Sequence, residues 1–354
     1  MAGSADERLG SETVMKTITL TRPGQLTFSS TAEPGEPGPG EALIRVQRVG
    51  ICGTDIHAFH GRQPFFSYPR ILGHELGVEL LALGPGVSAL NIGDRCAVEP
   101  YLNCGTCIAC RRERPNCCAQ LRVLGVHIDG GMRELITLPA HKLHRSASLS
   151  YEQLALVETL AIGAHAVQRA ALEPGEHVLV IGAGPIGLTV MQFAKLAGAQ
   201  VIALDISDTR LAFCHAQGLA THTVRADSAA LAQIEALTGG DLPTAVFDAT
   251  GNAASMMQAF EYVAPSGRLV FVGLMQGEIS FNDPQFHRRE ITLLATRNAA
   301  PADFQMIIGQ IERGAIDTMP WITHRASAAE LVEQFPAWLQ PDAGLLKGVV
   351  NFGG

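Results

Sequence analysis

One segment constrains the fold of this 354-residue chain more than any other: residues 173–205, EPGEHVLVIGAGPIGLTVMQFAKLAGAQVIALD. An apolar run at 178–181 leads directly into the turn GAGPIG, which has the spacing G-x-G-x-x-G, and a helical pattern follows. Such glycines permit a tight turn and let the backbone approach a pyrophosphate, while the N-terminus of the next helix offers N–H groups and the positive end of its dipole. The segment therefore predicts a strand, a phosphate-binding turn, a helix and a second strand, with cofactor contacts from Gly182, Gly184, Pro185, Ile186 and Gly187.

An acidic residue closes the second predicted strand. Asp205 lies 18 residues after Gly187, where a carboxylate can accept hydrogen bonds from both ribose hydroxyls of a dinucleotide. Because a carboxylate also repels a 2′-phosphate, NAD is favoured over NADP. Arg210 lies nearby and could accommodate that phosphate, so NADP stays open as the less favoured cofactor. The remaining predicted cofactor contacts are Arg210, Thr250, Val272 and Gly273.

The two parts of the chain predict different kinds of structure. After residue 205, strands are predicted at 244–251, 267–274 and 291–298, and they alternate with helices such as 255–263, which fits a doubly wound parallel sheet. The N-terminal part has short β runs broken by glycine and proline, such as EALIRVQRVGICGTDI and GDRCAVEP, and these are typical of a compact β-barrel-like domain. The predicted fold class is therefore α/β, with a β-rich domain beside a nucleotide-binding domain.

Five of the eight cysteines lie in one segment, NCGTCIACRRERPNCC at residues 103–118. Cys104, Cys107 and Cys110 have the spacing C-x2-C-x2-C, and Cys118 follows after seven intervening residues, so one loop can place four thiolates around a zinc ion. Four thiolates fill the coordination sphere, which predicts a closed structural site. A disulfide, a redox role and an iron–sulfur cluster are the alternatives, but the proline that usually follows the last cysteine of such a cluster is absent.

Charge and hydropathy narrow the class of function. The net charge of −8 provides no basic patch for nucleic acid or a membrane surface. Neither a transmembrane segment nor a secretory signal is recognisable, and the polar residues 1–14 are predicted to be a disordered leader. We expect a reducing cytoplasmic compartment, where disulfides are rare, and this favours metal binding by the clustered cysteines.

A second set of possible metal ligands stands outside the cysteine loop. Cys52 lies in GICGTDIHAFHG, His74 and Glu75 lie in GHE, and Glu158 is a further acid that precedes a predicted helix in LALVETLAIGAHA. A catalytic zinc ion needs three protein ligands and one open position. These residues therefore predict a second, catalytic metal site.

The order of GICGTDIH, GHE, CGTCIAC, a later cysteine, GAGPIG and an aspartate resembles the zinc-dependent medium-chain dehydrogenases, the family of the alcohol, sorbitol and threonine dehydrogenases. The resemblance covers residues 15–352. It implies a GroES-like catalytic domain joined to a Rossmann domain, one catalytic and one structural zinc ion per chain, and NAD-dependent oxidation of an alcohol. A zinc-free reductase or a non-enzymatic binding protein is disfavoured because Cys52, His74 and Thr54 are all present.

The resemblance also implies roles for individual residues. Cys52 and His74 match zinc ligands of the family, and Glu158 stands where alcohol dehydrogenases have a second cysteine, as in the polyol and sugar dehydrogenases. It leaves open whether Glu75 or Glu158 binds the metal directly while the other acts through water. The catalytic residues implied are Thr54 and His57, which match the relay that carries the substrate proton to solvent by way of the cofactor ribose, and Asp55, which matches the acid that orients His74.

Substrate residues are implied in the same way. The stretches QPFFSYPRILGHE, LGVHIDGG, TRNAAPADF and LLKGVVNF resemble bacterial members of the sugar branch that oxidise aldonic acids. The expected reaction transfers a hydride from a secondary alcohol of an L-galactonate-like sugar acid to NAD; polyol, L-threonine and simple alcohol dehydrogenases are the alternatives. Arg297 and Asn298 follow the last predicted strand, and an arginine there could bind a carboxylate bidentately, although a cofactor or subunit contact is equally open. His127 could meet substrate hydroxyls, and Lys347 matches a basic pyrophosphate contact, with a surface lysine as the alternative.

The organisation expected from these matches has three parts. Residues 1–14 form the leader, residues 15–163 with 299–354 form the catalytic domain and its two zinc sites, and residues 164–298 form the NAD-binding domain. The expected partner is a small sugar acid or polyol, with no nucleic acid and no membrane. The family resemblance favours a homotetramer, with a dimer as the alternative.

Overall fold

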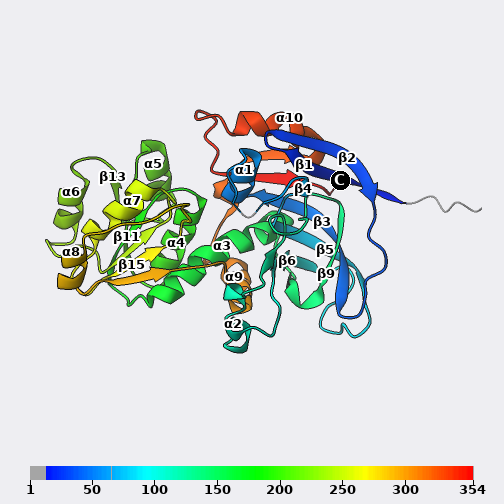
Figure 1. The fold of residues 1–354 in the computed structure, drawn as a ribbon, viewed down its shortest axis with the longest axis horizontal. Helices are drawn as coiled ribbons and strands as arrows, with labels where there is room; N and C mark the ends of the chain where they lie inside the picture. The colour runs from blue at the N-terminus through cyan, green and yellow to red at the C-terminus, as the bar shows by residue number, and fades with distance from the viewer. Residues whose placement is uncertain (1–12, 65, 354) are drawn as a thin grey trace, which may run out of the picture.

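The structure, a computed structural model, describes residues 13–64 and 66–353. Figure 1 shows a β-rich lobe and an α/β lobe side by side, with the long helix α3 (Tyr151–Ala170) running between them. The predicted leader falls mostly on residues 1–12, which lie outside the described residues. The first strand begins at Val14, one residue before the predicted start of the catalytic domain.

The β-rich lobe is built on two sheets that draw on both ends of the chain. The larger sheet has the order β10-β6-β5-β3-β18-β17, with β9 also pairing with β3, and the smaller has the order β2-β1-β4. A further pair, β7 with β8, lies apart from both. The strands are β1 (Val14–Arg22), β2 (Gln25–Ala32), β3 (Glu41–Ile51), β4 (Arg70–Ile71), β5 (Glu75–Leu83), β6 (Arg95–Val98), β7 (Tyr101–Leu102), β8 (Arg122–Val123), β9 (Leu135–Pro139), β10 (Leu143–Ser146), β17 (Ile322–Ser327) and β18 (Lys347–Asn351).

The C-terminal residues complete the β-rich lobe. β18 pairs antiparallel with β3, so the last strand lies beside the strand that leads into Cys52. The helices of this lobe are α1 (Gly53–Phe59), α2 (Ile108–Arg111), α9 (Pro301–Glu312) and α10 (Ala328–Trp338), with short 3-10 helices η1 (Pro115–Cys117), η2 (Ala140–Lys142) and η4 (Met319–Trp321).

The α/β lobe contains one parallel sheet with the strand order β13-β12-β11-β14-β15-β16. Numbered within the lobe this is the order 3-2-1-4-5-6 of a Rossmann fold, in which ligands bind outside the carboxyl ends of the strands where the order reverses. The predicted fold class is therefore confirmed. The elements are β11 (His177–Ile181), β12 (Gln200–Asp205), β13 (His222–Arg225), β14 (Ala245–Asp248), β15 (Arg268–Phe271), β16 (Thr292–Ala295), α4 (Pro185–Leu196), α5 (Asp208–Ala216), α6 (Ala230–Leu237), α7 (Ala253–Gln258), η3 (Ala259–Tyr262) and α8 (Asp283–Arg288).

Two expectations about helices differ from the structure. The helix predicted at 255–263 begins earlier, capped by the Asn252 side chain, and continues beyond Gln258 as the 3-10 helix η3. Glu158 lies within α3 rather than before a helix, because Ser150 caps α3 eight residues earlier.

Helix α3 joins the two lobes and crosses the predicted boundary between residues 163 and 164. It contacts β5 in the β-rich lobe and α4 in the α/β lobe. A Cβ atom added at Gly163 would lie 2.3 Å from Thr189 Oγ1, so α3 and α4 pack at very close range there. One buried cluster runs from Leu154 and Val157 on α3 to Val180 on β11, so the lobes share part of their core.

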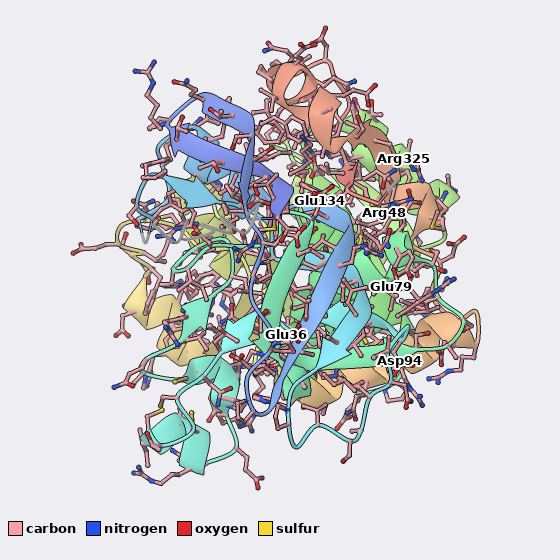
Figure 2. The ribbon with its side chains drawn as sticks, turned by 90° about the vertical axis from the view of Figure 1, so that its right-hand side faces the viewer. Glu36, Arg48, Glu79, Asp94, Glu134 and Arg325 are labelled. Atoms are coloured by element: carbon pink, nitrogen blue, oxygen red, sulfur yellow. The ribbon has the colours of Figure 1, made fainter. Side chains whose placement is uncertain are left out.

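The surface of the β-rich lobe carries charges of both signs. Figure 2 labels charged side chains of both signs on this face. The acidic ones are Glu36, Glu79, Asp94 and Glu134, and the arginines are Arg48 and Arg325. Among the described residues, no helix combines the length and the apolar character that crossing a bilayer requires.

Candidate functional site: a dinucleotide turn and two clusters of metal ligands

The glycine turn has the geometry that a bound pyrophosphate requires. Gly182 has φ +97°, a conformation that side chains with a Cβ atom rarely adopt, and a Cβ atom added at Gly187 would lie 1.7 Å from Gly182 O. In contrast, a Cβ atom at Gly184 would meet only Arg210 Nη1, at 3.8 Å. Because α4 begins at Pro185, the space beside Gly184 lies at a helix N-terminus with an arginine next to it.

Asp205 occupies its predicted place at the end of β12, close to the glycine turn. Its Oδ2 accepts a hydrogen bond of 2.6 Å from the Ala183 N–H, and its Oδ1 accepts one of 2.8 Å from the Ser207 N–H. These two donors fix the carboxylate in a largely buried position, and each oxygen keeps a lone pair for a ribose hydroxyl.

The other predicted cofactor residues lie at the carboxyl ends of the next two strands. Thr250 follows β14, and its hydroxyl donates to Asp248 Oδ1 at 2.7 Å. Val272 and Gly273 follow β15, and a Cβ atom at Gly273 would lie 2.4 Å from the Gly251 nitrogen. These three residues therefore lie at the same edge of the sheet as the glycine turn. The Thr250 hydroxyl hydrogen already has a protein partner in Asp248.

Among the described residues, two groups of side chains could each hold a metal ion. In the first, the Sγ atoms of Cys104, Cys107, Cys110 and Cys118 face one another. The separations are 3.5 Å for Cys107–Cys110, 3.8 Å for Cys107–Cys118 and 3.5 Å for Cys104–Cys118. Four thiolates about 2.3 Å from a tetrahedral zinc ion would lie roughly 3.8 Å apart, whereas a disulfide bond is about 2.05 Å long. The loop therefore fits zinc and excludes a disulfide among these four cysteines.

Backbone N–H groups stabilise the thiolate form of one cysteine in this loop, which is the form that binds a cation. The Cys107 N–H donates to Cys104 Sγ at 3.4 Å, and the backbone groups of Thr106 and Cys107 lower the pKa of the Cys104 thiol to about 6. Cys118 differs, since burial raises the pKa of its thiol to about 11. A bound metal ion would hold all four thiols as thiolates.

The second group consists of Cys52, His74 and Glu75, whose ligand atoms lie within 4.8 Å of one another. Cys52 lies immediately before α1, and Glu75 begins β5, which pairs with β3. Asp55 stands behind this group: its Oδ2 accepts a hydrogen bond of 2.9 Å from the Cys52 N–H, and its Oδ1 lies 3.9 Å from His74 Nδ1. Burial raises the pKa of Asp55, an effect that the nearby His74 opposes.

Glu158 is buried beside this group and has a partner that the sequence did not suggest. The Tyr101 hydroxyl donates a hydrogen bond to Glu158 Oε1. Burial raises the pKa of Glu158, while His74 and the Tyr101 hydrogen bond act in the opposite direction. Tyr101 begins β7, three residues before Cys104, and no motif marked it as a site residue.

Lys347 is buried in the β-rich lobe. It is 2 % exposed, so the surface alternative is wrong. Its ammonium group pairs with the Glu75 carboxylate and donates to Ile51 O at 3.1 Å. Burial is the largest single influence and opposes the charge of Lys347, but Glu75, Cys52 and Glu158 together outweigh it and raise the pKa of Lys347. The pairing of β18 with β3 explains this position, and the pyrophosphate contact stays a prediction.

The predicted relay residues lie on α1, directly after Cys52. Thr54 and His57 are three positions apart and therefore share a face of the helix. Thr54 is half-buried and His57 is exposed, as a path from a buried site to solvent requires. Burial lowers the pKa of His57, and the charges of Arg62 and His60 lower it further, so the imidazole is neutral and can accept a proton near pH 7.

The predicted substrate residues come from separate parts of the chain. His127 Nδ1 accepts a hydrogen bond of 3.1 Å from the Val123 N–H. Burial lowers the pKa of His127, and the positive charges of Arg297 and Arg70 lower it further. Arg70, which the sequence analysis did not select, forms an ion pair of 3.2 Å with Asp129. The Asp129 carboxylate therefore offsets the charge of Arg70 beside His127.

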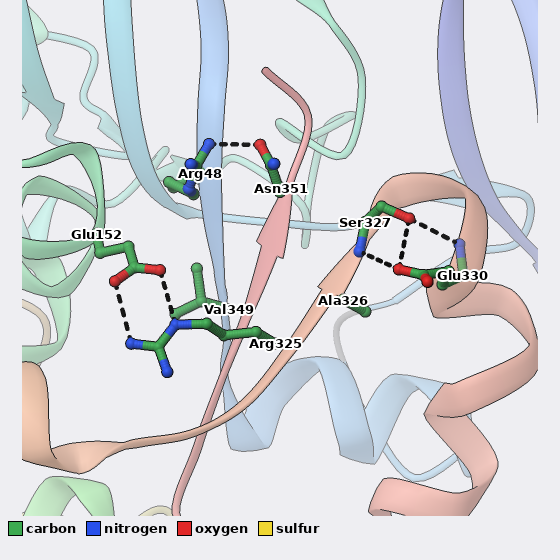
Figure 3. Close-up of a pocket in the computed structure, with 8 residues that line it drawn as sticks. All are labelled: Arg48, Glu152, Arg325, Ala326, Ser327, Glu330, Val349 and Asn351. Carbon is green, nitrogen blue, oxygen red and sulfur yellow. Dashed lines mark hydrogen bonds and ion pairs between the residues drawn. The ribbon is translucent and has the colours of Figure 1, made fainter. Parts of the chain in front are cut away.

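A separate hollow of about 360 Å³ lies at the edge of the larger sheet and contains none of these residues. Figure 3 shows its charged side chains paired with neighbours: Arg325 binds Glu152, and Glu330 binds Ser327. Arg48 similarly donates to Asn351. We assign no function to this hollow because its charges already have partners.

The comparisons with known proteins agree with this geometry. The model of the alcohol dehydrogenase GroES-like domain matches residues 38–148, and that of the zinc-binding dehydrogenases matches residues 185–313. The chain belongs to the zinc-dependent medium-chain dehydrogenase family. It is therefore a zinc alcohol or polyol dehydrogenase, an oxidoreductase whose cofactors are zinc and NAD, as predicted.

Individual relatives show how close the similarity is. L-galactonate-5-dehydrogenase of Escherichia coli K12 is 42% identical over 96% of this chain and 99% of its own length, and a sorbitol dehydrogenase of Bacillus subtilis is 33% identical over 88% and 90%. A solved short chain alcohol dehydrogenase of E. coli CFT073, in complex with NADH, is 29% identical over 96% of this chain and 99% of that one, with a TM-score of 0.89. A putative zinc-binding dehydrogenase of Sinorhizobium meliloti 1021 bound to NADP is 30% identical over the same shares, with a TM-score of 0.87.

Proposed function

We propose that the enzyme oxidises a secondary alcohol of a sugar acid of the L-galactonate type and uses NAD in preference to NADP. The observation that carries the substrate class is the similarity to L-galactonate-5-dehydrogenase, which is 42% identical over 96% of this chain. An aldonate differs from a polyol by one negative charge, and Arg297 is the residue that we expect to pair with it. The similarity to sorbitol dehydrogenase keeps a polyol as the second candidate.

The side chains of this protein hold the metal ions in place and provide a path by which the substrate proton reaches solvent. Zinc, when bound, provides a Lewis acid that favours loss of the substrate hydroxyl proton, and NAD accepts the hydride from the carbinol carbon. We propose that Cys52, His74 and Glu75 hold the catalytic zinc and that Cys104, Cys107, Cys110 and Cys118 hold the structural zinc. Asp55 orients His74, and the Thr54 hydroxyl passes the proton towards His57 and solvent.

The same proposal assigns the remaining parts. Gly182, Gly184, Pro185, Ile186, Gly187, Asp205 and Arg210 bind the dinucleotide, with Thr250, Val272 and Gly273 beside them. Residues 15–163 with 299–354 act as the catalytic domain and residues 164–298 as the NAD-binding domain, connected through α3. The proposed assembly is a homotetramer in the cytoplasm.

The substrate class is tested by Arg297→Ala. A bidentate pair with a carboxylate contributes roughly 1.5–3 kcal/mol, so KM for L-galactonate is expected to rise about tenfold to a hundredfold while KM for a neutral polyol changes little. Steady-state NADH formation over a panel of aldonates, polyols, simple alcohols and L-threonine measures this. Arg288→Ala is the matched control, since the hydrogen bond of that exposed arginine found among the described residues is to Gln285 within its own helix. Turnover confined to polyols, or an unchanged KM for L-galactonate, would remove the sugar-acid assignment.

Glu75 and Glu158 are distinguished by zinc content. We expect Glu75→Gln to weaken binding of the catalytic zinc, because Glu75 belongs to the ligand group with Cys52 and His74. Glu158→Gln should retain both zinc ions and lower turnover, since Glu158 lies outside that group and is held by Tyr101. Atomic absorption on folded protein measures zinc per chain, with Tyr101→Phe as the control that keeps the Glu158 carboxylate. Loss of zinc from Glu158→Gln alone would reverse the assignment.

A further inference from the structure

A buried side chain connects the cysteine loop to the turn that carries Arg297. Asn116 lies in η1, between Cys110 and Cys118, and is 2 % exposed. Its Nδ2 donates a hydrogen bond of 2.9 Å to Arg297 O, and Asn298 Nδ2 donates one of 3.5 Å to Asn116 O. The loop and the turn are therefore joined by two hydrogen bonds although they are far apart in the sequence.

The Asn116 amide is itself held from the other side. Its Nδ2 lies 3.2 Å from His165 Nε2 on α3, and His165 Nδ1 lies 3.2 Å from Asp303 Oδ2 on α9. An amide nitrogen can only donate, so His165 Nε2 accepts and His165 Nδ1 carries the proton that is donated to Asp303. Asp303 also accepts from the Ala300 N–H at 2.8 Å, which fixes the start of α9. One tautomer of His165 is thus compatible with every hydrogen bond that these three buried side chains make, while the buried Asn116 Oδ1 has no partner among the described residues.

The turn at 297–298 has a left-handed residue at its centre and, among the described residues, no strand pairing. Asn298 has φ +48°, a conformation in which asparagine is enriched among non-glycine residues, and β16 has already ended at Ala295. Between that strand and the start of α9, the hydrogen bonds with Asn116 therefore anchor the turn directly. A shift of this backbone would move the Arg297 guanidinium group.

Arg297 lies close enough to His127 for its charge to lower the pKa of that imidazole. His127 Nδ1 in turn accepts a hydrogen bond from the Val123 N–H. Val123 pairs with Tyr101 across β7 and β8, and the Tyr101 hydroxyl binds Glu158. Hydrogen bonds and strand pairing thus connect His127 to Glu158, and the charge of Arg297 acts on the first residue of this set.

We propose that Asn116 is a positioning residue for substrate recognition, through which the cysteine loop sets the place of Arg297. This inference rests on the proposed function, because it needs Arg297 to bind the substrate carboxylate. It gives the cysteine loop a role in specificity besides stability: when its four thiols are held together, Asn116 is fixed between Cys110 and Cys118 and holds the Arg297 carbonyl.

The test compares four variants of the zinc-loaded enzyme. Asn116→Ala removes the donor, and Asn116→Asp keeps the side-chain volume but presents an oxygen to the Arg297 carbonyl. Arg111→Ala is the matched control within the loop, since the Arg111 guanidinium donates to Thr106 O at 2.5 Å and stays inside the loop. Arg297→Ala reports the carboxylate contact itself. For each, kcat and KM are measured with L-galactonate, galactitol and NAD, together with zinc per chain and the melting temperature.

We expect both Asn116 variants to raise KM for L-galactonate at least tenfold, with kcat within about twofold, two zinc ions retained and unchanged KM values for galactitol and NAD. Arg111→Ala should leave every KM unchanged. If Arg297→Ala raises KM for L-galactonate but neither Asn116 variant does, the inference is wrong and the proposed function stands. An equal rise for all three ligands would show a purely structural role and also overturn it. If Arg297→Ala has no effect, the carboxylate contact fails and the inference fails with it.

Discussion

Replacing His74 by alanine is expected to reduce zinc from two ions to one per chain and to lower kcat/KM about a thousandfold or more. His74 is buried within the group formed with Cys52 and Glu75, so its loss leaves too few protein ligands for a stable catalytic site. A Lewis acid contributes several kcal/mol of transition-state stabilisation, and about 4 kcal/mol corresponds to a thousandfold change in rate. Atomic absorption and steady-state NADH formation measure the two effects.

A milder substitution next to His74 distinguishes loss of the catalytic zinc from loss of the fold. Asp55→Asn keeps the shape of the side chain that stands 3.9 Å from His74 Nδ1 but removes its charge. Loss of such a supporting carboxylate usually costs about tenfold to a hundredfold in metal affinity, so this variant should lose zinc to a chelator faster than the unaltered enzyme while keeping the cysteine-loop zinc. Two zinc ions and unimpaired turnover in His74→Ala would refute the proposed ligand group.

The parts of the fold that could be predicted are those set by local sequence. The end of β12 at Asp205 and the start of α4 at Pro185 agree with the pattern, because an apolar run, a glycine turn and a proline at the first helical position act over a few residues. The cysteine spacing is local in the same sense: one loop brings its four Sγ atoms together.

What could not be predicted depends on contacts between distant segments. Lys347 is placed by the pairing of β18 with β3, which buries its ammonium group against Glu75 and could not be inferred from the residues around it. Tyr101 reaches Glu158 across 57 positions, and Arg70 on strand β4 influences the pKa of His127 although the two residues are far apart in the sequence. The Ser150 cap that starts α3 before Glu158 is local, and a capping box formed with Gln153 could have revealed it.

The domain boundary shows the same limit. The sequence divides the chain at residues 163–164, but a helix can pass through a boundary without any change in composition. The close contact of Gly163 with Thr189 and the shared core around Leu154 make α3 part of both lobes. We infer that relative motion of the lobes would have to occur around this helix rather than at a flexible linker.

The second large effect is expected in the glycine turn, where two similar substitutions should act differently. In Gly187→Ala, the added Cβ atom would lie 1.7 Å from Gly182 O, a backbone atom that cannot rotate away. The turn between β11 and α4 must therefore open, at a cost of about 3 kcal/mol or more, which lowers the melting temperature by roughly 10 °C. NADH binding should be lost as well, since Asp205 is fixed by the Ala183 N–H of the same turn.

Gly184→Ala is the matched variant that leaves the fold intact. Its Cβ atom would meet only Arg210 Nη1, at 3.8 Å, so the melting temperature should stay within about 2 °C of the original. If the pyrophosphate approaches the backbone at Gly184, the added methyl group occupies that space and Kd for NADH should rise at least tenfold, or about 1.4 kcal/mol. Fluorescence titration with NADH and thermal melting measure both variants. Unchanged NADH affinity in Gly184→Ala would place the pyrophosphate elsewhere, because the space beside Gly184 is what the turn leaves open for it.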